Sequence, residues 1–282
     1  GDDRMDKTRI GPWPRRHFIA LLLILLLATT TRLVGLQDQS LWYDESDRVF
    51  IASLPLPQMF HAMAQETLAY LPFYFLAVKP FSQPFHETAV RFPSVAFGVL
   101  GIAVMAQAGR KLFGRNGGLM AALLLALNPF HIWFSRDANF YIVVALSSTG
   151  ALYFFACLLR RPRLRSWIGL TLMTGLGLWT HYFALAIPLV GFAYLAINFR
   201  RYHHLLRPWV AAQIVAVLPL APWYVFLVQR GEFYFGSAAS ESPKLVDLLY
   251  TFWNFSIGYT VEYTPFVVAS LVLFGGAMLL AV

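Results

Sequence analysis

Residues 17–36 read HFIALLLILLLATTTRLVGL, a run of twenty residues that is almost entirely apolar. A helix rises about 1.5 Å per residue, so a run of this length crosses the roughly 30 Å hydrocarbon core of a bilayer. Comparable runs follow at 89–108, 117–135, 140–159, 166–182, 183–199, 208–228 and 263–282. A large soluble core could hold one such run, but hardly eight. The sequence therefore predicts an all-α polytopic membrane protein with about eight transmembrane helices.

The composition of the chain agrees with a membrane protein. Of the 282 residues, 58% are hydrophobic and 13% are charged, whereas about a quarter of the residues in a soluble domain are charged. The net charge of +8 comes from basic residues in short segments between the apolar runs. Such residues set the orientation of spans, so we expect no nucleic-acid partner. The single cysteine, Cys157, lies in a predicted span and can form neither an intrachain disulfide nor a cysteine zinc cluster.

The N-terminal and C-terminal segments of the sequence each allow a prediction. Gly1–Arg4 precede Met5 and resemble the remnant of an expression tag, and we expect residues 1–16 to form a cytoplasmic segment. The first apolar run has no small-residue cleavage site after it, so we expect an uncleaved span. Because the sequence stops at Val282 within an apolar run, the natural chain can be expected to extend further.

The distribution of charge predicts the topology. With a cytoplasmic N-terminus, the basic clusters at 110–115, 160–165 and 200–207 all fall on the cytoplasmic side, and every acidic residue after Asp6 falls outside. This requires that residues 68–81 (LAYLPFYFLAVKPF) do not cross the membrane, and about fourteen residues containing a proline are short for a span. We expect an interfacial or re-entrant segment there. In the same outer loop, residues 46–54 and 57–66 predict two short interfacial helices.

Two adjacent carboxylates, Asp44 and Glu45, lie just outside the first predicted span, directly after Trp42 and Tyr43. Carboxylates near lipid are costly unless they are solvated, paired or used. Asp44 could cap a helix that starts near Glu45, with Asp47 in its first turn. Alternatively, the pair provides a general base or a metal ligand in an interfacial cavity.

Two further polar clusters lie at the predicted outer ends of spans. In the turn from Ser135 to Tyr141, Arg136 could bind a phosphate, and Asp137 could pair with it, cap the next span or face the first loop. A solvated turn with a local ion pair is the alternative. In Thr180-His181-Tyr182-Phe183, the histidine is either a ligand or a hydrogen-bonded packing residue. The basic residues that could meet a phosphate on this side, unless they snorkel to the interface, are Lys79, Arg91 and Arg136.

The sequence contains no P-loop, no glycine-rich nucleotide fingerprint and no Cys/His metal spacing. An enzyme that uses a nucleotide donor would need a soluble lobe, and none is visible. A donor for an outer site must therefore arrive through the membrane.

Five short motifs, in this order, resemble those of GT-C glycosyltransferases that use polyprenyl-phosphate donors, a group that includes protein O-mannosyltransferases and lipid A aminoarabinose transferases. The motifs are Leu41-Trp42-Tyr43-Asp44-Glu45, the run from Leu71 to Lys79, Arg91-Phe92-Pro93-Ser94, the run from Ser135 to Tyr141, and Thr180-His181-Tyr182-Phe183. The resemblance covers about residues 15–200 and implies a GT-C-like transmembrane domain over 17–282. The chain departs from the family pattern before Pro72, where Ala69-Tyr70-Leu71 replaces an acid or histidine followed by proline, and at Asn139, which replaces a second arginine.

The resemblance implies roles for individual residues. Asp44 would be the catalytic base, Glu45 the neighbour that orients the acceptor or a metal, and Asp137 a second acid. A divalent metal would be held by Asp44, Glu45 and His181. This set of roles requires Asp44, Asp137 and His181 to converge on one pocket. The residues implied in substrate binding are Tyr43, Tyr74, Lys79, Arg91, Arg136, Tyr141, His181 and Tyr182.

The function implied by the resemblance is the transfer of a sugar from a polyprenyl-phosphate donor to a hydroxyl group of a lipid, glycan or protein acceptor, in one displacement with inversion. We expect it on the non-cytoplasmic side of a bacterial cytoplasmic membrane. An oligosaccharide-transferring relative is the alternative within the same class. A lipid or sugar transporter would carry charged groups near the midplane and repeated halves, and a non-catalytic scaffold would be insensitive to changes in the three acids.

Overall fold

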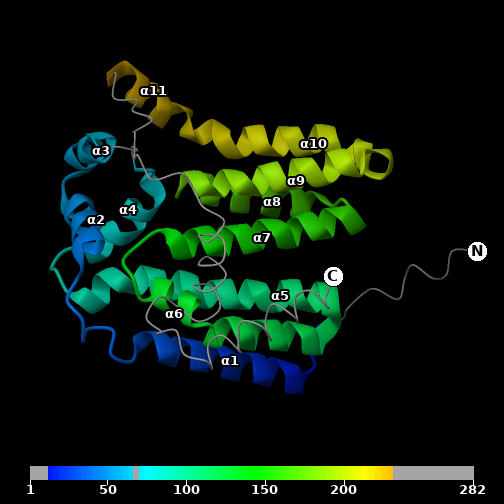
Figure 1. The fold of residues 1–282 in the computed structure, drawn as a ribbon, viewed down its shortest axis with the longest axis horizontal. Helices are drawn as coiled ribbons and strands as arrows, with labels where there is room; N and C mark the ends of the chain where they lie inside the picture. Colours follow the sequence, from blue (N-terminus) through cyan, green and yellow to red (C-terminus); the bar gives the residue numbers. More distant parts are fainter. Residues whose placement is uncertain (1–11, 66–69, 231–282) are drawn as a thin grey trace, which may run out of the picture.

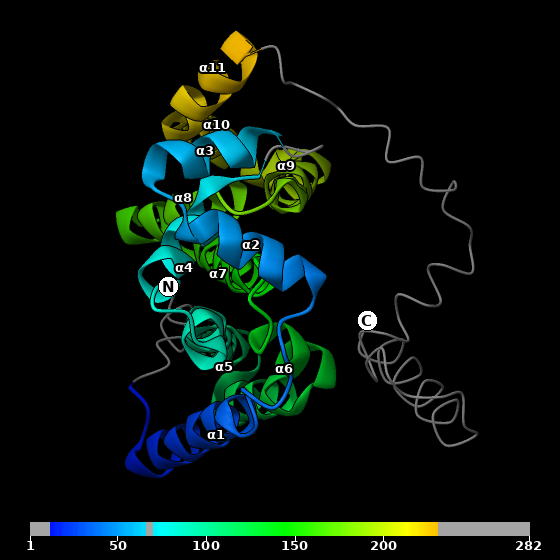
Figure 2. The same ribbon diagram turned by 90° about the vertical axis from the view of Figure 1, so that its left-hand side faces the viewer.

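The computed structural model describes residues 12–65 and 70–230, and within these ranges all regular structure is helical. Long helices lie side by side in a bundle, and a group of short helices covers one of its ends (Figures 1 and 2). The α-helices are α1 (Arg15–Leu33), α2 (Tyr43–Ser53), α3 (Leu56–Gln65), α4 (Pro72–Val78), α5 (Glu87–Leu127), α6 (Pro129–Ser135), α7 (Tyr141–Arg160), α8 (Leu164–Leu178), α9 (Ala186–Ile197), α10 (Phe199–Val217) and α11 (Ala221–Arg230). Short 3-10 turns lie at η2 (Lys79–Phe81), η3 (Tyr182–Leu185) and η4 (Leu218–Leu220).

Four helices in the described part of the chain are long and apolar enough to cross a membrane. They are α1, α5, α7 and the continuous run Phe199–Gln229, and a shorter apolar helix covers Tyr182–Ile197. Eight spans were predicted. The predicted span 263–282 lies outside the described residues, and the predicted span 166–182 appears as α8, which has 15 residues. The all-helical membrane class is confirmed, while the number eight stays a prediction.

Helix α5 contains 41 residues and folds back on itself, so it covers the predicted span 89–108 and the first part of the predicted span 117–135. Its turn is at Gly114, where φ is 82° and ψ is −175°, a conformation open essentially to glycine alone. Small residues let the two arms approach closely: a Cβ atom added to Gly118 would lie 2.6 Å from the carbonyl oxygen of Ala106. The second arm ends at Leu127 because Pro129 begins a new helix, α6, which Asn128 caps by accepting from the His131 N–H. The prediction of one span over 117–135 is therefore wrong at its end.

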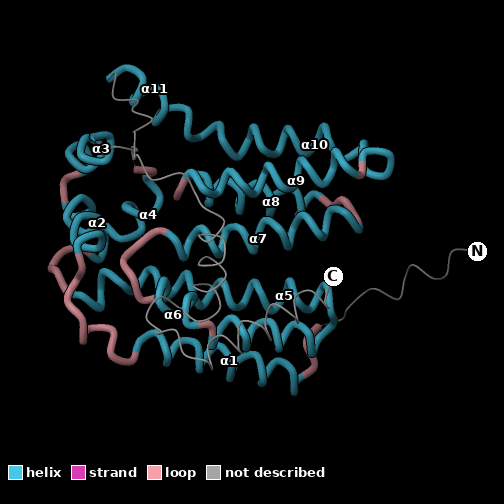
Figure 3. The backbone as a smooth tube through the Cα atoms, in the orientation of Figure 1, coloured by secondary structure: helices cyan, strands magenta, loops and turns pink. Residues whose placement is uncertain are grey.

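The short helices α2, α3 and α4 lie at the end of the bundle where α1 ends and α7 begins (Figures 1 and 3). The two predicted interfacial helices are present as α2 and α3, but α2 starts at Tyr43. Asp44 therefore lies within its first turn and does not cap it, which corrects the capping alternative. Helix α4 has seven residues, too few to cross a bilayer, as predicted for segment 68–81. We call this end of the molecule the site end.

The opposite end, which we call the basic end, holds the start of α1, the Gly114 turn, and the α7–α8 and α9–α10 connections (Figure 1). The basic clusters at 110–115, 160–165 and 200–207 lie at or next to these turns, so the charge separation expected from the sequence is present in the fold.

One buried cation ties the long helices together. Arg32, fully buried on α1, donates to the carbonyl oxygen of Ala126 on α5 (3.2 Å) and contacts Nδ1 of His131 on α6 (2.9 Å). A charge inside a span is tolerated only when paired or hydrogen-bonded in this way. Arg32 therefore fixes how α1 packs against the α5 hairpin.

Candidate active site

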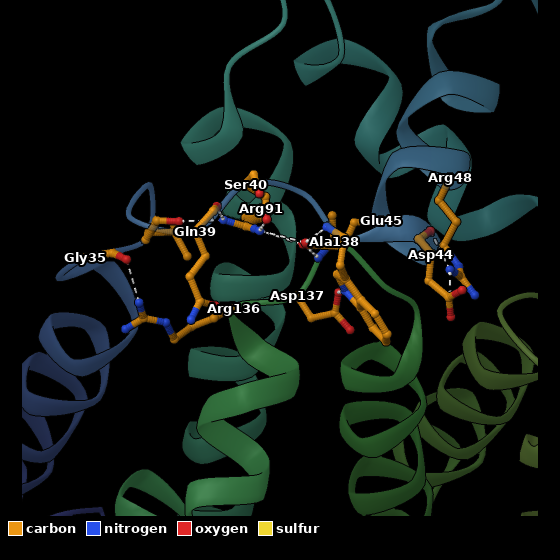
Figure 4. A network of polar contacts seen from close by, with 12 residues as sticks. Gly35, Gln39, Ser40, Asp44, Glu45, Arg48, Arg91, Arg136, Asp137 and Ala138 are labelled. Atoms are coloured by element: carbon orange, nitrogen blue, oxygen red, sulfur yellow. Dashed lines mark hydrogen bonds and ion pairs between the residues drawn. The ribbon is translucent and has the colours of Figure 1, made fainter. Parts of the chain in front are cut away.

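A buried ion pair between Glu45 and Arg91 forms the centre of the site end (Figure 4). The Arg91 guanidinium binds the carboxylate through two parallel bonds, Nε to Oε1 at 2.8 Å and Nη2 to Oε2 at 2.6 Å. Its remaining N–H groups donate to the carbonyl oxygens of Leu36 (2.7 Å), Gln39 (2.9 Å) and Ser40 (3.3 Å). Arg91 thus uses all five of its donors within the protein.

This pair joins segments that are far apart in the sequence. Glu45 Oε1 also accepts from the backbone N–H of Ala138 at 2.7 Å, and Oε2 accepts from the N–H of Trp42 at 3.4 Å. The carboxylate therefore holds α2, α5 and the 136–140 turn in one arrangement. With both oxygens occupied, Glu45 serves to position the site, and Arg91, predicted to bind substrate, has no donor left for a phosphate.

Two other predicted phosphate ligands are also engaged by main-chain carbonyl groups. Arg136 donates to the carbonyl oxygens of Thr31 (3.2 Å), Val34 (2.8 Å) and Gly35 (2.7 Å). These carbonyls belong to the end of α1, where a cation also interacts favourably with the helix dipole. Lys79 donates to the carbonyl oxygens of Ala52 and Leu54 at the end of α2 in the same way. The structure therefore gives both residues a role in holding helix ends.

Arg48 was not identified from the sequence, although it is the cation nearest to Asp44. Its Nη1 lies 3.5 Å from Asp44 Oδ2, with 7% of the Arg48 side chain and 43% of the Asp44 side chain exposed. The guanidinium lies over the rings of Phe140 (4.9 Å) and Tyr70 (5.6 Å). Its buried Nε has no hydrogen-bond partner among the described residues. The signal in the sequence was the i, i+4 spacing from Asp44 to Arg48, which places both on one helix face.

Asp137 is the second buried acid of the site end, with 5% of its surface exposed. Trp42 Nε1 donates to its Oδ1 at 3.2 Å, while Oδ2 is buried without a partner in the described part of the chain. Burial, together with the negative charge of Glu45, raises the pKa of Asp137 to about 7. Asn139, two residues further along the chain, likewise has a buried Nδ2 that donates to no described residue. Such unsatisfied polar atoms identify a place where a ligand can bind.

The third predicted cluster meets the first two through Phe140. His181 stacks on the Phe140 ring at 4.6 Å between centroids, and its Nδ1 accepts from the Phe183 N–H at 3.1 Å. Since Arg48 lies over the same Phe140 ring, the line Asp44–Arg48–Phe140–His181 is continuous. The structure therefore brings the three predicted motifs together at one end of the bundle.

The predicted tyrosines differ in position. Tyr141 and Tyr182 pack near His181, with ring centroids 5.9 Å and 6.2 Å from it. Tyr43 is 85% exposed. Tyr74 is buried, and its hydroxyl is hydrogen-bonded to Ser94 at 2.8 Å, so it joins α4 to α5. Tyr141 and Tyr182 therefore border the site, while Tyr74 belongs to its supporting core.

The predicted metal ligands do not form a metal site in this arrangement. Within residues 12–65 and 70–230, no three His, Cys, Asp or Glu residues are grouped so that they could hold an ion. Both Glu45 oxygens are taken by Arg91 and backbone N–H groups, and His181 Nδ1 is taken by Phe183. The residues present do not fit the predicted ion, so no step below is derived through one.

The fold and the site end define a class of protein: an integral membrane protein whose helix bundle carries a carboxylate–arginine cluster at the end that the short helices cover. Residues 67–226 match the family described as dolichyl-phosphate-mannose-protein mannosyltransferase. Because the match covers more than half of the chain, the chain belongs to this family. The resemblance to GT-C glycosyltransferases is thereby confirmed.

A solved structure is similar in fold. It is the crystal structure of ArnT from Cupriavidus metallidurans bound to undecaprenyl phosphate, with a TM-score of 0.60 and 20% identity, over 79% of this chain and 43% of that chain. The chain thus spans less than half the length of that protein. No curated protein sequence matches the chain.

Proposed function

We propose that this chain transfers a sugar from a polyprenyl-phosphate donor to a hydroxyl group of an acceptor, at the site end of the bundle. The proposal is supported by one observation above all: Asp44, Arg48 and Asp137 converge there with unsatisfied polar atoms, on the fold of a GT-C family. The fold is shared with ArnT, whose crystal structure holds undecaprenyl phosphate. A lipid-linked donor keeps its chain in the bilayer while its head reaches the interfacial helices.

The chemical step uses Asp44 as the general base. Its carboxylate is half-exposed, so an acceptor hydroxyl can reach it, and proton removal by a positioned carboxylate accelerates such reactions by about 10²–10⁴-fold. The acceptor oxygen forms a bond to the anomeric carbon from the face opposite the phosphate. The bond from that carbon to the phosphate oxygen breaks, and the polyprenyl phosphate leaves with the electron pair. The product has the inverted configuration.

Arg48 and Asp137 act on the departing phosphate. Arg48 has donors that no described carboxylate satisfies in full, and it is buried among aromatic rings where its charge is poorly screened. With a pKa of about 7, Asp137 is protonated in a large fraction of molecules at neutral pH and can donate a hydrogen bond from Oδ2. Two carboxylates whose environments differ in this way divide base and donor roles between them.

The sidedness of the reaction is part of the proposal. Arginine and lysine clusters lie at the basic end, and the positive-inside rule assigns such loops to the cytoplasm. The site end then faces the non-cytoplasmic side. In a bacterium this corresponds to the outer face of the cytoplasmic membrane, with a lipid, glycan or protein as the acceptor.

The test is a transfer assay with the purified full chain in lipid vesicles, given polyprenyl-phosphate sugars with a labelled sugar. Asp44→Asn should lower single-turnover transfer by at least about 100-fold while leaving the melting temperature unchanged. Asp38→Asn, which alters an exposed acid at the same end, is the matched control and should leave transfer near wild type. Wild-type transfer by Asp44→Asn, or movement of intact donor across the vesicle membrane without transfer, would refute the proposal.

A further inference from the structure

A second polar site lies at the basic end, remote from the acids of the site end. An open hollow of about 340 Å³ is lined by Arg16, His17, Asn116 and Leu119, where the first turn of α1 meets the second arm of α5. Residues 12–20 and 109–120, which surround it, contain no Asp or Glu. The cations here are therefore not neutralised by neighbouring carboxylates within these two segments, in contrast to Arg91 at the site end.

The wall of the hollow contains polar atoms that the protein satisfies only in part. His17 is 8% exposed, and its Nε2 lies 3.1 Å from Asn116 Oδ1, while its buried Nδ1 has no partner among the described residues. Buried polar atoms normally have partners, so this wall favours a ligand that carries hydrogen-bonding oxygens.

The surroundings of the hollow combine charge with exposed apolar surface. The Trp13 ring lies 4.8 Å from the Arg110 guanidinium and 6.3 Å from the His17 ring. Phe113 and Leu112 at the hairpin turn are 77% and 51% exposed, and Met120, beside Leu119, is 56% exposed. An aromatic residue beside arginines and bare apolar side chains is typical of the membrane interface. A ligand at this place would meet both positive charge and exposed apolar side chains.

We propose that this hollow binds the phosphate headgroup of an anionic membrane phospholipid. Arg16 supplies positive charge in the hollow and Arg110 lies nearby, over the Trp13 ring; Asn116 supplies an exposed amide, and Leu119 with Met120 would contact the acyl chains. The apolar surface is the reason for choosing a lipid over free phosphate, which would gain nothing from it. Basic pockets between membrane helices on the cytoplasmic side are suited to such headgroups. The lipid would hold α1 against the hairpin, at the end of the molecule away from the chemistry.

The experiment uses the purified full chain, stripped of lipid in a neutral detergent and titrated with phosphatidylglycerol or with phosphatidylcholine of the same acyl chains. Bound lipid is counted by native mass spectrometry. We expect phosphatidylglycerol to bind at least about fivefold more tightly, the effect of one basic residue near a membrane surface. Equal binding of the two lipids would overturn the proposal, as would displacement of phosphatidylglycerol by millimolar inorganic phosphate, which would assign the hollow to the free ion.

Matched variants separate a site from general attraction. Arg16→Gln should weaken phosphatidylglycerol binding about fivefold, and Asn116→Asp, which places a negative charge in the hollow, should weaken it further. Arg15→Gln removes the same charge one residue away, outside the hollow, and should change binding less than about twofold. Arg15 and Arg16 are both exposed, so neither change should unfold the protein. Equal loss in Arg15→Gln and Arg16→Gln would show that only the overall charge attracts the lipid.

Discussion

The site end and the basic end of the bundle use their cations in different ways. At the site end, Arg91, Arg136 and Lys79 donate to carbonyl groups and to one carboxylate, and they hold loops and helix ends in place. At the basic end, Arg16 is exposed and lines a hollow around which no acidic residue lies in the neighbouring segments. A basic residue close to an expected substrate is therefore informative only after its donors have been counted. At the site end, Arg48 is the cation beside Asp44 whose buried Nε has no partner among the described residues.

The largest expected effect follows from removing the central cation of the site end. In Arg91→Ala, Glu45 would remain buried without its partner, and an unpaired buried charge of this kind costs about 3–5 kcal/mol of stability. Thermal unfolding in detergent micelles measures the loss. Arg207→Ala, at an exposed position of the basic end, is the control and should stay within about 0.5 kcal/mol of wild type. Equal melting temperatures for the two variants would contradict the stabilising role assigned to the Arg91–Glu45 pair.

Arg48 should affect chemistry more than stability. Arg48→Met keeps an unbranched apolar stem, although a shorter one, and loses the charge proposed to stabilise the leaving phosphate; loss of one such group lowers turnover about 10²–10³-fold. Arg48→Lys should recover part of the rate, since it restores the charge. The measurement is single-turnover transfer in vesicles, with the melting temperature recorded for each variant. If Arg48→Met transfers sugar at the wild-type rate, the phosphate contact lies elsewhere.

The raised pKa of Asp137 predicts that the free energy of unfolding depends on pH. Its folded-state pKa of about 7 lies above its ordinary value of 3.8, so the folded state binds more protons between these two values. The free energy of unfolding contributed by this group therefore falls as pH rises from about 4 to 7 and is constant above about 8. Asp137→Asn should remove this component, which is measured as the difference in melting temperature between variant and wild type across pH 4–8. A difference that does not change with pH would contradict the assigned shift.

The smallest expected effect concerns the turn at the basic end. Gly114→Ala places a side chain at φ 82°, which costs about 1–3 kcal/mol by backbone strain alone, since no atom lies within 4 Å of the added Cβ. Gly175→Ala, in the regular helix α8, is the matched control and should be neutral or stabilising. Thermal unfolding distinguishes them. If Gly114→Ala is as stable as the control, the second arm of α5 does not depend on this turn.

Much of the candidate site was predictable, because the order of the five motifs along the chain indicated which loops lie together at one end of the bundle. Asp44, Asp137 and His181 were expected to converge, and contacts through Arg48 and Phe140 link all three segments. The start of α2, predicted at residue 46, was missed by three residues, since Trp42, unlike Asp44, is no typical cap residue. The predicted metal ligands Asp44, Glu45 and His181 are not arranged around one point, because the Glu45 carboxylate binds Arg91. The sequence does not indicate this pairing.

The sequence by itself determined the helical membrane class, the presence of short helices between the first two long ones, and the separation of basic from acidic residues in the described part of the chain. Each of these depends on local hydropathy, proline positions and charge, which are properties of neighbouring residues. Only the tertiary structure decided which cations have donors left for a ligand. Arg91, Arg136 and Lys79 are satisfied largely by backbone carbonyl groups, and every residue carries the same carbonyl, so no pattern of side chains reveals which ones lie within reach.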